Sequence, residues 1–288
     1  MSLRFLRTAF FASSIGLTAL MGLTSCSSSS ASSSGSSGAV DAGPVSTQPP
    51  VTTLFAKSIT SVVIEIDYAA GAEPYVGNVE KFGDPWRLFN GNSLAIFDGK
   101  KTVTFPKTLA KMEKLDDVPA QNFSNTDLLA VAAAHRTEPQ YSNGASFYVI
   151  FVNGYWLDEA GTERKDILSV AIGNTGVIAM FKPAISTPVV NPTPPPQFIE
   201  QLALIHAFGH AVGFVDNGVP VVESNRAHVD TENVHHCTNK QCALAFPVET
   251  AAGAAAYAKQ LIRSPESILY GQECLSDARL LETEQLGQ

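Results

Sequence analysis

Residues 204–218 read LIHAFGHAVGFVDNG and place two histidines, His206 and His210, four positions apart in an apolar run. We predict that this run belongs to a helix that begins near Pro196 or Gln197 and that Gly213 ends. On a helix, side chains at positions i and i+4 share one face, about 5–6 Å apart at Cβ. Two imidazoles in this arrangement can bind one zinc ion. The alternative is an ordinary pair of core or surface histidines.

The other histidines favour the zinc interpretation. Five of the six fall within 31 residues, and only His135 lies elsewhere in the chain. Three of them, His228, His235 and His236, follow the helix in a polar, loop-like stretch. A folded loop of this length can bring a third ligand to the pair on the helix.

The helix resembles the metzincin signature HExxHxxGxx, which is followed by a third zinc ligand. The segment from His236 and Cys237 to Cys242 is similar to the archaemetzincin pattern, in which a histidine, a cysteine, four residues and a second cysteine follow one another. The chain looks closest to a group of secreted bacterial proteins regarded as predicted zinc proteases. The match covers residues 198–244, with a long insertion between His210 and His236.

The resemblance makes His236 our first choice for the third zinc ligand. Asp216 stands six positions after His210, where short-spaced metzincins place theirs, and a carboxylate is an accepted zinc ligand. His228 and His235 remain further alternatives. Asp216 with Asn217 and Gly218 is also an ordinary turn, and loop histidines are usually solvated.

Two residues depart from the family pattern. Ala207 occupies the position of the glutamate that polarises the zinc-bound water, and alanine cannot accept a proton. General acid–base catalysis typically contributes about 10²–10⁴-fold, so the chain is expected to be slow or inactive unless Glu223 or Glu232 substitutes. Leu244 stands where the family has the methionine of the turn beneath the zinc; it can fill a similar volume.

The order of the predicted elements favours one α+β domain over residues 54–288. Its first half is expected to hold a mixed sheet and a helix, and its second half to be helical with long loops. An active-site cleft is expected between the two halves. A proline-rich connection, 183–196, separates the halves. The predicted strands are 61–68, 93–97, 101–105, 147–152, 167–172 and 177–181, and the predicted helices are 125–135, 196–212, 249–262 and 274–281.

A hairpin or bulged edge is predicted around Gly173–Gly176. The resemblance implies that an edge strand above the cleft binds extended substrate by main-chain pairing, and it assigns this role to Gly173, Gly176, Val177 and Ile178. The alternative is a sheet edge without a binding role.

Residues 1–25 are expected to form a lipoprotein signal peptide, because Arg4 and Arg7 precede an apolar stretch without acidic residues. Cys26 follows Leu23-Thr24-Ser25, which resembles a lipobox and predicts lipidation of Cys26. Residues 26–53 are rich in Ser, Gly and Pro and predict a flexible linker. The expected location is therefore outside the cytoplasm, as a lipoprotein of the outer membrane, periplasm or cell surface, attached to the membrane through its lipid only.

The remaining cysteines, Cys237, Cys242 and Cys274, are disulfide candidates in an oxidising compartment, although their odd number leaves the pairing open. The formal net charge of −8 argues against nucleic acid as a partner. These features favour an exported zinc-binding, catalytically impaired protease homologue that binds a peptide or protein. An active zinc metalloendopeptidase with a substitute base and a structural surface lipoprotein without metal are the alternatives.

Overall fold

The computed structural model describes residues 51–80, 83–138, 143–187, 194–261 and 268–284 of the 288-residue chain. The predicted signal peptide 1–25, Cys26 and most of the predicted linker 26–53 lie outside the described residues. Helix α1 (Val51–Leu54) includes the last residues assigned to the linker.

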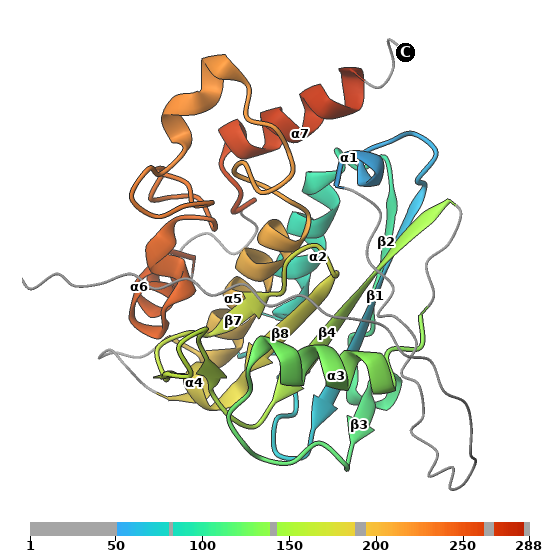
Figure 1. Cartoon of the computed structure of the whole chain (residues 1–288), viewed down its shortest axis with the longest axis vertical. Helices are drawn as coiled ribbons and strands as arrows, with labels where there is room; N and C mark the ends of the chain where they lie inside the picture. Colours follow the sequence, from blue (N-terminus) through green and yellow to red (C-terminus); the bar gives the residue numbers. More distant parts are fainter. Residues whose placement is uncertain (1–50, 81–82, 139–142, 188–193, 262–267, 285–288) are drawn as a thin grey trace, which may run out of the picture. The chain divides into compact units, whose positions relative to one another are not determined.

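A mixed sheet forms the centre of the fold (Figure 1). Its strand order is β2-β1-β4-β8-β7, and a further short strand, β3, also pairs with β1. All pairings are parallel except that of β7 with β8. The strands are β1 (Ser61–Ala69), β2 (Thr102–Thr104), β3 (Glu113–Leu115), β4 (Gly144–Val152), β7 (Ser169–Ala171) and β8 (Val177–Phe181).

Strand β4, GASFYVIFV, is buried along its whole length. A continuous apolar run without alternation is typical of a strand that is covered on both faces. The predicted central strand at 147–152 is therefore confirmed. A separate two-stranded hairpin consists of β5 (Trp156–Leu157) and β6 (Glu163–Arg164).

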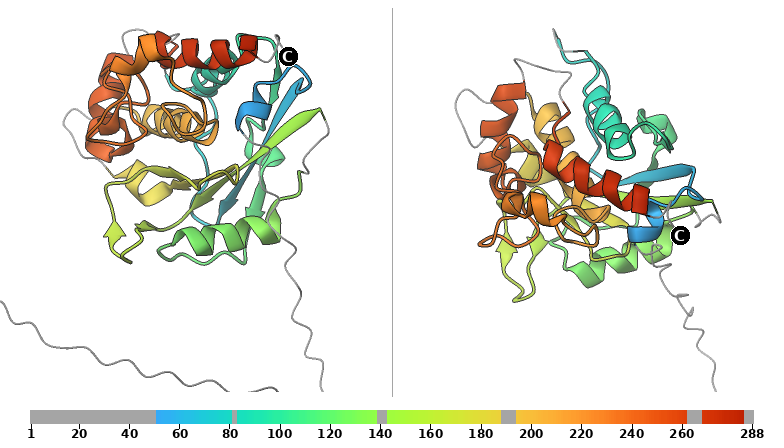
Figure 2. Two further views of the ribbon diagram at one scale, coloured as in Figure 1. Left: turned by 45° about the horizontal axis from the view of Figure 1, so that its top comes forward. Right: turned by 90° about the horizontal axis from the view of Figure 1, so that it is seen from above.

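Helices cover both faces of the sheet (Figure 2). Helix α3 (Asn125–His135) lies on one face, and α2 (Trp86–Ile96) and α5 (Pro196–Ala211) lie on the other. Helix α3 begins where predicted, because Ser124 and Asp127 form a reciprocal capping box.

Helix α5 is held on the sheet by aromatic contacts. The ring centroid of Phe208 lies 5.5 Å from that of Phe89 on α2 and 5.1 Å from that of Phe147 on β4. Thirteen residues of this helix are buried, including His206 and Ala207. The apolar run that contains the two histidines therefore lies within the protein core.

Two sequence predictions are wrong. Residues 93–97 are no strand: they form the end of α2, whose Trp86, Phe89, Ser93 and Ile96 are buried at helical spacing. Val177 and Ile178 are no edge residues either, because β8 lies between β4 and β7 and both side chains are fully buried. The edge strand of this hairpin is β7.

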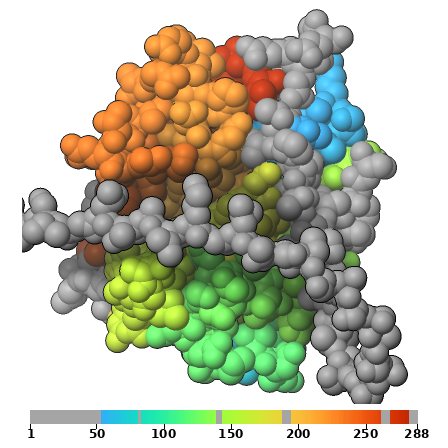
Figure 3. All heavy atoms as spheres, in the orientation of Figure 1, coloured from blue at the N-terminus to red at the C-terminus, as the bar shows by residue number. Residues whose placement is uncertain are grey.

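The C-terminal half is helical with long loops, as predicted. Figure 3 shows the loop that follows α5 on the surface, in orange. The remaining helices are α4 (Lys182–Ser186), α6 (Ala251–Leu261), α7 (Gln272–Glu284) and three short 3-10 helices, η1 (Leu109–Lys111), η2 (Glu223–His228) and η3 (Phe246–Glu249). Within the described ranges no helix has the length and apolar character needed to cross a membrane.

Candidate metal centre

Three histidines converge at the C-terminal end of α5. His206 and His210 project from the helix, and His236 reaches them from the loop that follows. One nitrogen from each of the three lies within 4.8 Å of the other two. Nε2 of His206 and Nε2 of His210 are 3.1 Å apart, close to the edge of about 3.3 Å expected for two nitrogens in a tetrahedral zinc site.

Backbone carbonyls set the orientation of two of these rings. Nδ1 of His206 lies 2.7 Å from the carbonyl oxygen of Ala243, and Nδ1 of His236 lies 3.0 Å from that of Val234. A carbonyl only accepts hydrogen bonds, so each Nδ1 carries the proton and each Nε2 keeps its lone pair. Nε2 of His236 is buried and makes no hydrogen bond. Three imidazoles arranged in this way fit a metal ion.

Burial keeps the helix histidines neutral. It lowers the pKa of His206 to about 4, although the hydrogen bond to Ala243 works in the opposite direction. Burial also lowers the pKa of His210 well below its usual value, and His206 and His236 add to the effect. Neutral imidazole is the form that binds metals.

A cavity of about 280 Å³ lies beside the three histidines. Its wall includes Ala207, Trp156 and the edge strand β7 with Gly173. Ala207 contributes only a methyl group where the resemblance expects a carboxylate. The pocket thus joins a candidate metal centre to the open edge of a sheet.

The predicted substitute bases do not line this cavity. Glu223 pairs with Arg226 at 2.8 Å, and its side chain is 85% exposed. Glu232 is also exposed. Glu249 does line the cavity, and its Oε2 atom lies 3.4 Å from Nε2 of His236.

Sequence reasoning missed Glu249, because its only signal was its position at the start of a predicted helix, 13 residues after His236. Burial raises the pKa of Glu249, whereas the contact with His236 and the nearby His206 lower it. The net shift of this pKa is downward. Glu249 thus places a carboxylate oxygen next to His236 at the wall of the cavity.

The alternative third ligands lie elsewhere. Asp216 adopts a left-handed conformation with φ of 58° in the turn after α5 and is not part of the histidine group. His235 lines the cavity, but its Nδ1 atom is 3.4 Å from the carbonyl oxygen of Val215. His228 belongs to a second group, with Cys237 and Cys274. His236, our first choice, is the one that joins the pair on the helix.

The turn Cys242-Ala243-Leu244 lies against α5. A Cβ atom added to Gly209 would lie 2.8 Å from Leu244 Cδ2 and 2.9 Å from Tyr270 Cε1. The absence of a side chain at Gly209 thus allows this close approach, and Leu244 packs against the helix at Gly209.

The disulfide prediction is not confirmed. Cys237, Cys242 and Cys274 are all buried and all free. The sulfur atoms of Cys242 and Cys274 are 3.8 Å apart, and their surroundings are described below.

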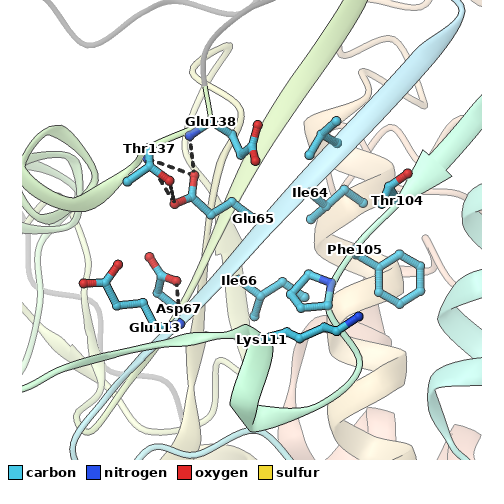
Figure 4. A pocket seen from close by; sticks show the side chains of 12 residues that line it. Ile64, Glu65, Ile66, Asp67, Thr104, Phe105, Lys111, Glu113, Thr137 and Glu138 are labelled. Atoms are coloured by element: carbon cyan, nitrogen blue, oxygen red, sulfur yellow. Dashed lines mark hydrogen bonds between the residues drawn. The ribbon is translucent and has the colours of Figure 1, made fainter.

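A second cavity, of about 370 Å³, lies beside β1 and contains an acidic group (Figure 4). Glu65 accepts hydrogen bonds from Thr137 and Glu138, and Asp67 accepts one from the backbone of Glu113. Burial raises the pKa of Asp67 to about 6, although the Tyr148 hydroxyl and the Glu113 amide oppose the shift. The Glu113 amide contacts Oδ1 of Asp67, whereas Oδ2 is buried without a hydrogen bond.

Comparisons of the chain with protein-family models, with curated proteins and with solved structures gave no match.

Proposed function

We propose that the chain is an exported, lipid-anchored, metzincin-like protein that binds zinc through His206, His210 and His236 and binds a peptide or protein segment in the adjacent cavity. We propose further that its peptidase activity is impaired because Ala207 replaces the general base. The observation that carries the proposal is the convergence of the three imidazoles beside an open sheet edge.

The donor set favours zinc over harder cations. Three neutral imidazoles suit zinc, copper, iron and nickel, whereas magnesium and calcium prefer oxygen ligands. Three protein ligands beside a cavity also leave a fourth position open, which is typical of catalytic rather than structural zinc sites. Bound zinc would supply Lewis acidity toward a peptide carbonyl in the cavity.

Strand β7 supports the peptide-binding part of the proposal. It pairs with β8 on one side, and Ser169, Val170 and Ala171 line the cavity. An extended peptide can add to a strand edge through main-chain hydrogen bonds. We therefore assign the peptide-binding role to β7 rather than to Val177 and Ile178. Gly173 lines the cavity and remains part of the proposed binding site.

Zinc analysis of the purified full-length chain tests the metal assignment. We expect that the double variant His206→Ala/His210→Ala contains one zinc ion fewer than the wild type. His135→Ala serves as the control, because His135 lies on α3 and pairs with Asp117. Equal zinc in wild type and double variant would contradict the proposal and would favour the surface lipoprotein without metal at this site.

Glu249 supports a second function, an active zinc metalloendopeptidase. It is the carboxylate that contacts the histidine group and borders the cavity. In that case wild-type protein hydrolyses peptides in a chelator-sensitive manner, and Glu249→Gln lowers turnover by about 10²–10⁴-fold while zinc content is unchanged. Wild type without turnover would exclude this function, and a Glu249→Gln variant with full turnover would exclude Glu249 as its base.

The anchor is tested separately from the cavity. We expect incorporation of labelled fatty acid into the wild type and none into Cys26→Ser. Label retained in the variant would contradict lipidation at Cys26.

A further inference from the structure

A second cluster of metal-binding side chains lies behind the turn 242–244. His228, Cys237 and Cys274 each offer one ligand atom, and these atoms lie within 4.8 Å of one another. The thiol of Cys242 lies 3.8 Å from that of Cys274 and also interacts with Cys237. Three donors thus form a close group, and the thiol of Cys242 lies beside its two sulfurs.

We propose that His228, Cys237, Cys242 and Cys274 bind a second, structural zinc ion. The proposal does not depend on the function of the first site. Three thiolates and one imidazole are a donor set typical of structural zinc.

Three of the distances between these donors match those of a tetrahedral ion. With Zn–S bonds of about 2.3 Å and Zn–N bonds of about 2.0–2.1 Å, two sulfurs lie about 3.8 Å apart, and a nitrogen and a sulfur about 3.6 Å apart. The Cys242–Cys274 sulfur distance is 3.8 Å. Nδ1 of His228 lies 3.6 Å from Cys237 Sγ and 3.7 Å from Cys274 Sγ.

The surroundings prepare these side chains for a metal. Nε2 of His228 lies 2.9 Å from Oδ2 of Asp277, so that nitrogen carries the proton and Nδ1 faces the sulfurs with its lone pair. Asp277 is itself held by the Val222 amide and the Asn225 side chain. A carboxylate that orients a ligating histidine is a usual feature of zinc sites.

Backbone amides also point at one sulfur. The amides of Gly271 and Leu244 donate to Cys242 Sγ over 3.1 and 3.4 Å. Such hydrogen bonds stabilise a thiolate, the form that binds zinc. A disulfide would use two of the thiols and leave the third, together with the His228 nitrogen, without a role.

The location indicates a structural ion. All four donors are at most 5% exposed. A closed site without room for water is typical of structural zinc. The ion would join η2 and the loop that follows it to α7, segments that are far apart in sequence but in contact in the fold (Figure 1).

The second ion would also support the first site. Cys242 is followed directly by Ala243, whose carbonyl oxygen orients His206. Loss of the second ion is therefore expected to lower zinc affinity at the three histidines by about 10–100-fold, the usual effect of disturbing an outer-shell partner.

Zinc stoichiometry of the full-length chain provides the test. We expect two zinc ions in the wild type and one in His206→Ala/His210→Ala, and we expect the cobalt-substituted double variant to show thiolate-to-cobalt charge-transfer absorption. A double variant without zinc, or with cobalt but without this absorption, overturns the proposal. One zinc in the wild type and none in the double variant would overturn it while leaving the first site intact.

Thiol chemistry on the wild type gives a second readout that no folding defect can disturb. Peptide mapping after alkylation of the native protein should find Cys237, Cys242 and Cys274 protected, and a strong chelator should expose all three as zinc is released. Alkylation of the three without chelator, or a Cys242–Cys274 disulfide found by mass spectrometry, overturns the proposal. Cys274→Ser should lose the second ion, whereas the matched loop variant His235→Ala should keep it.

Discussion

Nδ1 of His206 donates a 2.7 Å hydrogen bond to the carbonyl oxygen of Ala243. This bond links the helix that carries the histidine pair to the turn beneath it. The same turn begins at Cys242, which contacts Cys274 on α7. One backbone carbonyl thus connects the two candidate metal centres, and the orientation of His206 depends on how firmly the turn is held.

Restoration of the base at position 207 should restore peptidase chemistry. Ala207 lines the cavity beside the three histidines, so Ala207→Glu places a carboxylate where the resemblance expects it. We expect chelator-sensitive peptide hydrolysis to rise by about 10²–10⁴-fold. Ala207→Gln is the matched control, because it has a similar size but no base. Equal activity of the two variants would show that the remaining geometry does not support catalysis.

The edge of β7 allows a backbone test of peptide binding. Ile172 donates to Val177, and Phe181 donates to Leu168. In an antiparallel pair such bonded positions alternate, so Ala171 directs its backbone groups toward the open edge. Ala171→Pro removes the outward donor without removing a bond to β8.

We expect Ala171→Pro to weaken binding of an extended peptide by about tenfold, as measured by calorimetry, because one main-chain hydrogen bond contributes about 0.5–1.5 kcal/mol. Ala171→Ser keeps the amide and should bind like the wild type. Unchanged affinity in the proline variant would show that the peptide binds elsewhere.

The contact between Gly209 and Leu244 predicts a stability defect. Gly209→Ala would place its Cβ 2.8 Å from Leu244 Cδ2, and overpacking of this kind typically costs about 1–3 kcal/mol. The gain in helix propensity from glycine to alanine offsets about 1 kcal/mol of this. We expect a net loss of unfolding free energy in urea. In the Gly209→Ala/Leu244→Ala double variant the loss of unfolding free energy should differ from the sum of the losses in the two single variants. A loss equal to that sum would contradict the contact.

Asp67 predicts a pH-dependent stability. Its pKa in the fold is about 6 against an ordinary value of 3.8, so the folded state binds a proton more tightly than the unfolded chain. The contribution of Asp67 to the unfolding free energy should therefore be largest below about pH 4. It should fall by up to about 3 kcal/mol as the pH rises through 6.

Asp67→Asn should remove this fall, so that its melting temperature exceeds that of the wild type at pH 7 and the two converge toward pH 4. Asp116→Asn serves as control, because that carboxylate is 77% exposed. Parallel profiles of wild type and Asp67→Asn between pH 4 and 7 would contradict the assignment.

Local periodicity predicted most elements. The apolar run of β4, the capping box of α3 and the helix with His206 and His210 all follow from neighbours in sequence. Residues 93–97 were predicted as a strand because a short apolar run does not distinguish a strand from a buried helix. Contacts of α2 with the rest of the core decided that case.

The sequence by itself determined the helical pair His206 and His210, because i and i+4 spacing fixes one face whatever surrounds the helix. It also determined that Ala207 cannot act as a base. Only the tertiary structure decided that β7 forms the edge, that Glu249 reaches His236, and that His228 belongs with the cysteines. These relations join segments through loops and sheet order, and loop conformation depends on packing between distant residues rather than on local spacing.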